Sequence, residues 1–266
     1  MVKTEFCMNF AKDLDCGDFM LGEGLYAKAL QNLEKANLAR SKRRDDLDQC
    51  PATAITVLRR VMLLLKAGLK YKSILLLGDD DLLSVALSVT DIPCQIVVVD
   101  LDPTLLEIIK QNTDSSKVRV FLWDLRKPLP SDFIGQYDMI FTDPPYTLAG
   151  QLTFLEGAVS ALRCGKGSSL FFCASRFYLR DNRLEFIFDF LRKSSLEHME
   201  THEDFNEYVA PPDVLKDIKR RYPRSEATTF HSTLFCYASG SQTIRRGHRQ
   251  QESVNIYSYD NDNASS

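Results

Sequence analysis

The sequence predicts an α/β fold with a doubly wound, mostly parallel sheet, and three observations support this prediction. From about residue 73, short apolar runs that suit buried strands alternate with segments of helical periodicity. A glycine follows the first apolar run and aspartates follow several later ones, as at the carboxyl ends of strands that bind a ligand. The 266 residues are enough for one large domain with appendages.

Two helices are expected before the sheet. Residues 24–40 repeat apolar side chains at steps of three and four, and a charged connector follows over residues 40–46. Residues 53–66 carry a stronger apolar stripe, and Gly68 supplies a stop at the carboxyl end. The first of these helices lies in residues 1–46, which we expect to form an N-terminal helical extension, and the second belongs to the domain that follows.

Strands and helices then alternate as far as residue 240. The expected strands are residues 73–77, 95–100, 118–122, 137–142, 169–175, 196–200 and 232–238. The expected helices are residues 82–89, 104–112, 154–162, 182–193 and 213–221. The closing strand, helix and strand suit a sheet that ends with an antiparallel strand. After Gly240 the chain turns polar without periodicity, so residues 241–266 are expected to be a disordered tail.

Composition and charge exclude several classes of function. The net charge of −3 provides no positive field for nucleic acid, so we expect no nucleic-acid partner. No apolar run is long enough to span a bilayer and the start has no apolar leader, so we expect a cytoplasmic protein without a membrane partner. The seven cysteines include no Cys-x-x-Cys pair, and His198 and His202 have no evident third ligand, so we expect free thiols and no metal.

The first candidate site is Gly78-Asp79-Asp80-Asp81, which follows the apolar strand at residues 73–77. Glycine at a strand end lets a ligand approach the backbone closely, and the following helix presents free N–H groups. Three carboxylates would repel the pyrophosphate of a dinucleotide, and two glycines of that fingerprint are missing. The pattern favours a cationic ligand, such as the sulfonium of an S-adenosyl compound or an amine. The alternative is that the aspartates only cap the helix.

Two later aspartates are candidates for binding the nucleoside of such a ligand. Asp100 ends the second strand 22 residues after Gly78, where a carboxylate accepts hydrogen bonds from ribose hydroxyls. Asp124, with Leu125 beside it, follows the third strand and is placed to meet the adenine amino group. Trp123 either lines the base or packs, and the sequence leaves both interpretations open.

The most specific motif is Asp143-Pro144-Pro145-Tyr146, at the end of the fourth strand. Two consecutive prolines fix the backbone and direct its carbonyl groups. The motif is similar to that of amino-group methyltransferases, in which the first residue and a proline carbonyl accept hydrogen bonds from an amine and the aromatic ring stacks on the substrate. Such a loop orients the nitrogen lone pair toward an electrophilic carbon, and Asp143 can also stabilise positive charge or take up a proton.

Together these motifs resemble the branched-chain polyamine synthases, also called N(4)-bis(aminopropyl)spermidine synthases. The resemblance covers residues 47–240 and rests on the run 78–87, on residues 124–130 and on the run 137–147. Upstream, Asp48-Gln49 and Arg59-Arg60 are also similar to the segment before the family's catalytic domain. The resemblance implies a Rossmann-like class I S-adenosylmethionine-dependent transferase fold, with residues 47–240 as an aminopropyltransferase catalytic domain.

The resemblance also implies an activity and roles for the motif residues. An aminopropyl group would pass from decarboxylated S-adenosylmethionine to an amine nitrogen of a polyamine such as spermidine, releasing methylthioadenosine. The implied base is Asp81, then Asp79. The other implied site residues are Asp143 and Tyr146 in catalysis, Asp143, Pro144, Pro145 and Tyr146 in substrate binding, and Gly78, Asp80, Asp100, Asp124 and Leu125 in co-substrate binding.

Two other functions stay open at this point. The first is methyl transfer from S-adenosylmethionine to an amino group, which needs a partner for the carboxylate of that cofactor where three aspartates would repel it. The second is a non-catalytic binding module on the same fold. The residues before position 47 are too few for the family's N-terminal domain, so homodimerisation is left open. Phe205 and Tyr208 either cover the acceptor channel or pack in the core.

Overall fold

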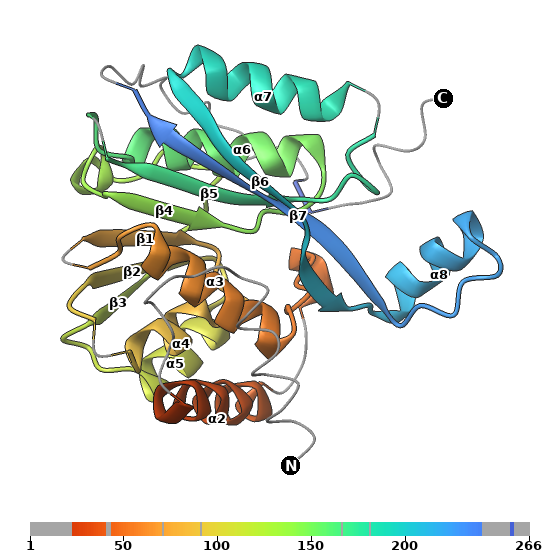
Figure 1. Ribbon diagram of the computed structural model, residues 1–266, viewed down its shortest axis with the longest axis horizontal. Coiled ribbons are helices and arrows are strands. Elements are labelled where there is room, and N and C mark those ends of the chain that lie inside the picture. Colours follow the sequence, from red (N-terminus) through yellow and green to blue (C-terminus); the bar gives the residue numbers. More distant parts are fainter. Residues whose placement is uncertain are drawn as a thin grey trace.

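The computed structural model describes residues 23–40, 44–70, 72–90, 92–165, 167–180, 182–240 and 256–257. Its centre is one seven-stranded sheet in the order β3-β2-β1-β4-β5-β7-β6 (Figure 1). The strands are β1 (Ser73–Leu77), β2 (Gln95–Asp100), β3 (Val118–Leu122), β4 (Met139–Thr142), β5 (Ser169–Ala174), β6 (Leu196–Val209) and β7 (Thr229–Ser239). Strands β1 to β5 are parallel, and β7 pairs antiparallel with both β5 and β6. The doubly wound, mostly parallel sheet with an antiparallel strand at its end is thereby confirmed.

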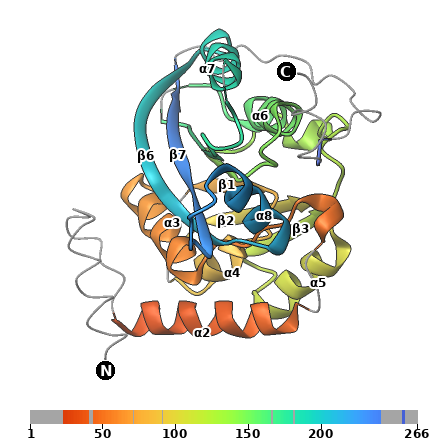
Figure 2. The ribbon, with the colours of Figure 1, turned by 90° about the vertical axis from the view of Figure 1, so that its right-hand side faces the viewer.

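Helices cover both faces of this sheet (Figures 1 and 2). They are α2 (Glu23–Ala39), α3 (Ala54–Lys66), α4 (Leu83–Ser88), α5 (Pro103–Asn112), α6 (Leu148–Ala161), α7 (Arg183–Lys193) and α8 (Pro212–Arg221), with short 3-10 turns η1 (Asp45–Leu47) and η2 (Ser131–Phe133). Helices α2 to α5 lie on one face and α6 and α7 on the other, and each face has its own apolar core cluster. Among the described helices, none has the length and apolar content needed to cross a bilayer.

Two elements differ in extent from the sequence prediction. Strand β6 continues to Val209, well beyond the predicted end at residue 200, and it forms a long hairpin with β7 that carries α8 away from the sheet (Figure 1). Two register shifts in β6 interrupt the alternation of buried and exposed residues, which explains why the pattern was missed. Helix α6 starts at Leu148 instead of residue 154, because the Thr147 side chain caps it by accepting from the Gly150 N–H.

The chain on either side of the predicted catalytic domain is described only in part. Residues 1–22, 241–255 and 258–266 lie outside the described residues, so the predicted extension and tail stay predictions there. Helix α2 buries Ala29 and Leu33 in the core cluster that it shares with α4. Near the other end, Ile256 is buried, and its carbonyl accepts a hydrogen bond of 2.9 Å from the Thr147 hydroxyl.

Candidate active site

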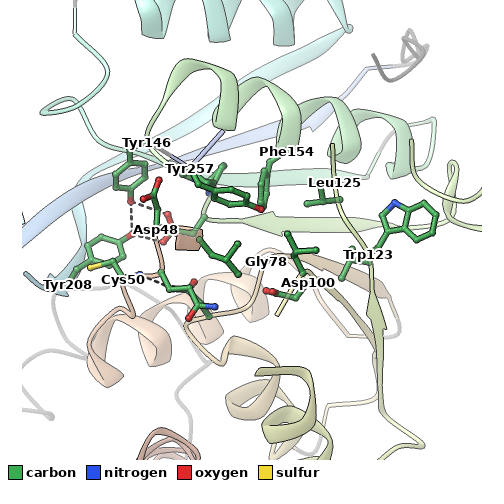
Figure 3. Close-up of a pocket in the computed structure, with 18 of the residues that line it drawn as sticks. Asp48, Cys50, Gly78, Asp100, Trp123, Leu125, Tyr146, Phe154, Tyr208 and Tyr257 are labelled. Carbon is green, nitrogen blue, oxygen red and sulfur yellow. Dashed lines mark hydrogen bonds between the residues drawn. The ribbon is translucent and has the colours of Figure 1, made fainter. Parts of the chain in front are cut away.

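One pocket lies where β1, β2 and β4 end, at the carboxyl edge of the parallel strands (Figure 3). Gly78 and Asp100 contribute from the ends of β1 and β2, and Asp143 contributes from the end of β4. Tyr208 of β6 reaches the pocket from the long hairpin. Figure 3 shows the pocket running from Tyr146 and Tyr208 at one end toward Gly78 and Asp100 at the other. We call these the amine end and the nucleoside end, after the ligand groups that the sequence analysis predicts for their residues.

The nucleoside end is built on a glycine turn and a fixed carboxylate. Gly78 has a φ of +73°, and its N–H donates to the carbonyl of Val99 at 2.9 Å. A Cβ at Gly78 would meet the Phe154 ring at 3.3 Å, so the glycine keeps this edge open. The carboxylate of Asp100 accepts from the backbone N–H of Asp79 at 3.0 Å and from that of Asp102 at 2.8 Å. Its orientation is therefore set by the backbone.

Of the three consecutive aspartates, the middle one lines the pocket. Leu82 has a left-handed φ of +60°, and its N–H bonds to the carbonyl of Asp79, which closes a tight turn. Asp80 faces the pocket from this turn and accepts from the backbone N–H of Cys50 at 3.0 Å. Such a turn sends neighbouring side chains in different directions, as the positions of Asp79 and Asp81 show.

The predicted bases Asp79 and Asp81 are both held by buried hydrogen bonds. Asp79 is buried and accepts from the backbone N–H and the hydroxyl of Ser84. Asp81 is buried and accepts from the backbone N–H of Ala52 and from the guanidinium of Arg60. Neither belongs to the residues that line the pocket, so the catalytic roles expected of Asp79 and Asp81 stay predictions.

Asp124 follows β3 as predicted, and its side chain is held by a neighbouring arginine. Its carboxylate forms an ion pair of 2.7 Å with Arg126, two residues further on, and it does not line the pocket. Its neighbours Trp123 and Leu125 do line the pocket, beside Gly78. The adenine contact of Asp124 stays a prediction, as does the co-substrate binding expected of Leu125.

The amine end is a cluster of hydroxyl, carboxylate and guanidinium groups. Asp143 accepts from the Tyr146 hydroxyl at 3.0 Å through Oδ1, and from the Tyr208 hydroxyl at 2.6 Å through Oδ2. The same Oδ2 lies 2.7 Å from Nη2 of Arg60. The Tyr146 hydroxyl oxygen also lies 2.9 Å from the Tyr208 hydroxyl oxygen, and the Tyr208 ring stacks on Phe230 at 4.7 Å. Both rings line the pocket.

The two prolines of the second motif are held from behind by α6. Gln151 Nε2 donates to the carbonyl of Cys173 at 3.1 Å and lies 3.5 and 3.4 Å from the carbonyl oxygens of Pro144 and Pro145. A Cβ at Gly150 would come within 2.9 Å of the Pro145 carbonyl oxygen, so only glycine fits under the loop. The loop is thus fixed both by its own prolines and by close packing.

Negative charge dominates the pocket. Asp48, Asp80, Asp100 and Asp143 line it, and none of its described lining residues is Lys or Arg. Burial raises the pKa of Asp80 well above the usual carboxyl range, and the neighbouring carboxylate of Asp81 adds to this effect. Burial also raises the pKa of Asp143, and the charge of Arg60 works against that effect. A cationic ligand bound in the pocket would stabilise the ionised forms of Asp80 and Asp143.

Several residues of the site were missed or left open by the sequence prediction. Arg60 interrupts the buried face of α3 and is fully buried, and a cation inside an apolar stripe is a signal that could have marked it. Tyr208, left open between covering the channel and packing, lines the pocket and also packs. Tyr257 lines the pocket from the predicted tail, and no feature of the sequence pointed to it.

Comparison with known proteins gives the same family for most of the chain. The model of the branched-chain polyamine synthase A C-terminal domain matches residues 28–221. The N(4)-bis(aminopropyl)spermidine synthase of Methanocaldococcus jannaschii is 30% identical over 207 residues, which are 75% of this chain and 59% of that protein. The synthase of the same name from Thermococcus kodakarensis is 32% identical over 155 residues, covering 57% of this chain and 44% of that protein. The matches thus span between 44% and 59% of the length of these relatives.

A solved structure shows the same fold. The branched-chain polyamine synthase of Thermus thermophilus, crystallised in complex with N4-aminopropylspermidine and 5'-methylthioadenosine, superposes with a TM-score of 0.74 at 23% identity. The match covers 84% of this chain and 67% of that one. The family model, which matches well over half of the chain, establishes the family: the chain belongs to the branched-chain polyamine synthases and carries their C-terminal domain.

Proposed function

We propose that the chain transfers an aminopropyl group from decarboxylated S-adenosylmethionine to an amine nitrogen of a polyamine such as spermidine. The observation that carries the proposal is the charge of the pocket, which four carboxylates and no described Lys or Arg line. Such a pocket suits a sulfonium, a terminal ammonium and a polycationic acceptor. The relatives named for this product and the Thermus thermophilus complex with methylthioadenosine support the same assignment.

The charge of the pocket also favours the decarboxylated donor. S-adenosylmethionine carries a carboxylate that needs a cationic or N–H partner, and among carboxylates it would be repelled. Arg60 is engaged with Asp81 and Asp143, and it does not line the pocket. A donor without that carboxylate keeps its ammonium, for which Asp48 or Asp80 can serve as the partner. The same pocket therefore disfavours methyl transfer from S-adenosylmethionine.

The nucleoside of the donor fits the end of the pocket at Gly78 and Asp100. The Asp100 carboxylate has a fixed orientation and can still accept from the ribose hydroxyls through its remaining lone pairs. Trp123 and Leu125 offer apolar surface to the base. The sulfonium then lies toward the middle of the pocket, between Asp80 and Asp143, with the aminopropyl carbon facing the amine end.

The transfer step is a displacement at carbon. The lone pair of the acceptor nitrogen attacks the methylene carbon next to the sulfonium, so that an N–C bond forms while the C–S bond breaks. The electron pair of the C–S bond stays on sulfur, which becomes the neutral thioether of methylthioadenosine. The acceptor nitrogen must first lose the proton of its ammonium form, and that proton needs a base in the pocket.

Asp80 is the base in this proposal, in place of Asp81. It faces the pocket, and its raised pKa makes it a better proton acceptor than an ordinary carboxylate. Asp143 and Tyr146 hold the acceptor nitrogen at the other wall, with Pro144 and Pro145 keeping the loop rigid. Orientation by this rigid loop brings the nitrogen in line with the C–S bond.

Calorimetric titration of the purified protein tests the donor assignment. S-adenosylmethionine, its decarboxylated form and methylthioadenosine are titrated side by side, and methylthioadenosine release is then measured with spermidine as acceptor. We expect the decarboxylated donor to bind at least about tenfold more tightly than S-adenosylmethionine, a difference of about 1.4 kcal/mol. The Asp132→Asn variant, at an exposed position away from the pocket, is the matched control and should behave as the unchanged protein.

Two results would contradict the proposal. Tighter binding of S-adenosylmethionine together with a methylated amine product would assign the chain to the methyltransferases. Absence of binding by all three ligands in a folded sample would assign it to the non-catalytic modules. Methylthioadenosine release that depends on a polyamine supports aminopropyl transfer directly.

A further inference from the structure

Arg60 of α3 is a fully buried cation that contacts three other parts of the site. Its Nε donates to Asn206 Oδ1 of β6 at 2.8 Å, and its Nη1 pairs with Asp81. Its Nη2 donates to Asp143 Oδ2 at 2.7 Å and to the Tyr208 hydroxyl at 3.1 Å. The guanidinium therefore joins α3, both aspartate motifs and the long hairpin behind the pocket wall.

The geometry of these contacts suits arginine and no other cation. The planar guanidinium serves partners in three directions at once, which the ammonium of lysine cannot do with the same fixed geometry. A buried charge is costly unless it is paired and hydrogen-bonded, and here Asp81 and Asp143 supply both conditions. The neighbouring Arg59, by contrast, is only half-buried and donates to the carbonyl of Phe205 at 3.1 Å.

We infer that Arg60 is a positioning residue that keeps Asp143 ionised and fixes its orientation toward the acceptor amine. This inference deepens the proposed function and rests on it for the identity of the acceptor. Because Oδ2 of Asp143 is occupied by Arg60 and Tyr208, only Oδ1, which accepts from Tyr146, is turned toward the rest of the loop. Asp143 then acts as a fixed anion, and proton uptake is left to Asp80.

Charged or titratable side chains face Asp143 from each of the elements packed against it. Burial raises the pKa of Asp143, Arg60 and the Tyr208 hydroxyl lower it, and Asp81 raises it. The titratable and charged groups that face it are Arg60 of α3, Asp80 and Asp81 of the turn after β1, Tyr146 of its own loop, Cys173 of β5 and Tyr208 of β6. Arg60 is the one cation in this described set, so its removal should move the titration of Asp143 upward.

The experiment measures the titration of Asp143 directly, without turnover. The carboxyl carbon resonance of Asp143 is followed against pH by NMR in the unliganded protein and is assigned with the Asp143→Asn variant. The variants are Arg60→Met, Arg60→Lys and the charge-balanced pair Arg60→Met with Asp81→Asn, compared with Asp81→Asn alone. The balanced pair is included because Arg60→Met leaves two buried carboxylates without their cation, which destabilises the folded protein.

We expect the midpoint of Asp143 to rise by about one pH unit or more when Arg60 is removed, each unit being a tenfold change in proton affinity. The comparison of the balanced pair with Asp81→Asn isolates Arg60, because both lack the Asp81 charge. Arg60→Lys should restore part of the shift. Arg59→Met is the matched control from the same helix and should leave the midpoint unchanged.

Turnover gives the second readout. In variants without Arg60 we expect kcat to fall at least about tenfold and the methylthioadenosine affinity to stay within about twofold. An Asp143 midpoint that is unchanged in the balanced pair would overturn the inference, whatever the activity. If the unchanged protein releases no methylthioadenosine, the proposed function fails, while the NMR titration still decides whether Arg60 sets the charge of Asp143.

Discussion

The two ends of the pocket are built in different ways. At the nucleoside end, Gly78 and Asp100 follow their strands directly, and the Asp100 carboxylate is held by backbone N–H groups. At the amine end, Asp143 is held by side chains that are distant in the sequence: Arg60 of α3 and Tyr208 of β6. Backbone anchors tolerate changes elsewhere in the chain, whereas a network of side chains depends on each member. Substitutions at the nucleoside end should therefore change affinity, and those at the amine end should change rate.

The largest expected effect is that of Asp80→Asn, which removes the proposed base. Loss of a general base costs about 10² to 10⁴ in rate, and we expect a fall in kcat of about 10³ with little change in methylthioadenosine affinity. Asp81→Asn is the comparison: it disturbs a buried ion pair, so it should lower the free energy of unfolding by about 3 kcal/mol and leave a measurable kcat. Steady-state kinetics and denaturant unfolding of both variants distinguish the roles. Loss of kcat in Asp81→Asn with Asp80→Asn active would restore Asp81 as the base.

The same assignment predicts the pH dependence of the unchanged protein. A base works only when deprotonated, and burial raises the pKa of Asp80 above the usual carboxyl range. The activity should therefore increase as pH rises through this raised pKa and be lost below it. This limb should be absent from the residual activity of Asp80→Asn. A profile that is flat down to the pH range of ordinary carboxylates would contradict a raised pKa at the base.

The second effect in size is at the nucleoside end. Asp100→Asn replaces one acceptor oxygen by a donor, and charge-assisted hydrogen bonds contribute about 1.5 to 3 kcal/mol, so methylthioadenosine should bind roughly 30-fold more weakly. The KM of the acceptor should stay the same. Asp102→Asn is the matched control, because Asp102 caps α5 and does not line the pocket. Equal losses of affinity in both variants would mean that the strand end as a whole was damaged.

The third effect tests how tightly the amine end is packed. Gly150→Ala places a methyl group 2.9 Å from Cβ and from the carbonyl oxygen of Pro145, and overpacking of this kind costs about 1 to 3 kcal/mol. We expect a lower melting temperature and a lower kcat, because the proline loop must shift. Gly157→Ala in the same helix has its nearest neighbour at 3.6 Å and should stabilise the protein by about 0.5 to 1 kcal/mol. If Gly150→Ala keeps full kcat, the exact position of the Pro144-Pro145 loop does not limit the rate of transfer.

The contrast between the two ends also explains what the sequence could predict. Alternating apolar runs predicted the sheet, and the strand ends predicted the positions of Gly78, Asp100 and Asp143, since these depend on local pattern and on a general property of parallel sheets. The direction of each aspartate in the triplet depends on the left-handed Leu82, which no pattern indicates. Asp124 follows β3 as predicted, and only the fold shows its ion pair with Arg126, so its contact with the adenine stays a prediction.

The amine end was beyond sequence reasoning for a different reason. Arg60 and Asp143 are 83 residues apart, and their contact exists only once α3 has packed against the sheet. Tyr208 lies on β6, and the register shifts of this strand interrupt the alternating pattern from which its full length could be predicted. The motif Asp143-Pro144-Pro145-Tyr146 marked the place proposed for the amine, yet the groups that contact Asp143 there include Arg60 and Tyr208 from elsewhere in the chain. A local motif indicates the kind of chemistry, and tertiary contacts determine the orientation and the charge of its side chains.

The smallest expected effect is that of Tyr208→Phe. It tests whether the amine end and the nucleoside end of the pocket act independently. The change removes a hydroxyl that donates to Asp143 at 2.6 Å, while the ring can keep its stacking on Phe230. The hydrogen bonds of this hydroxyl to Asp143 and to Arg60 are lost, so kcat/KM for the acceptor should fall about tenfold, whereas methylthioadenosine affinity should not change. Tyr222→Phe, at an exposed tyrosine after α8, is the control and should match the unchanged protein. If methylthioadenosine affinity falls instead, then Tyr208 serves the nucleoside end, and the two ends are not energetically separate.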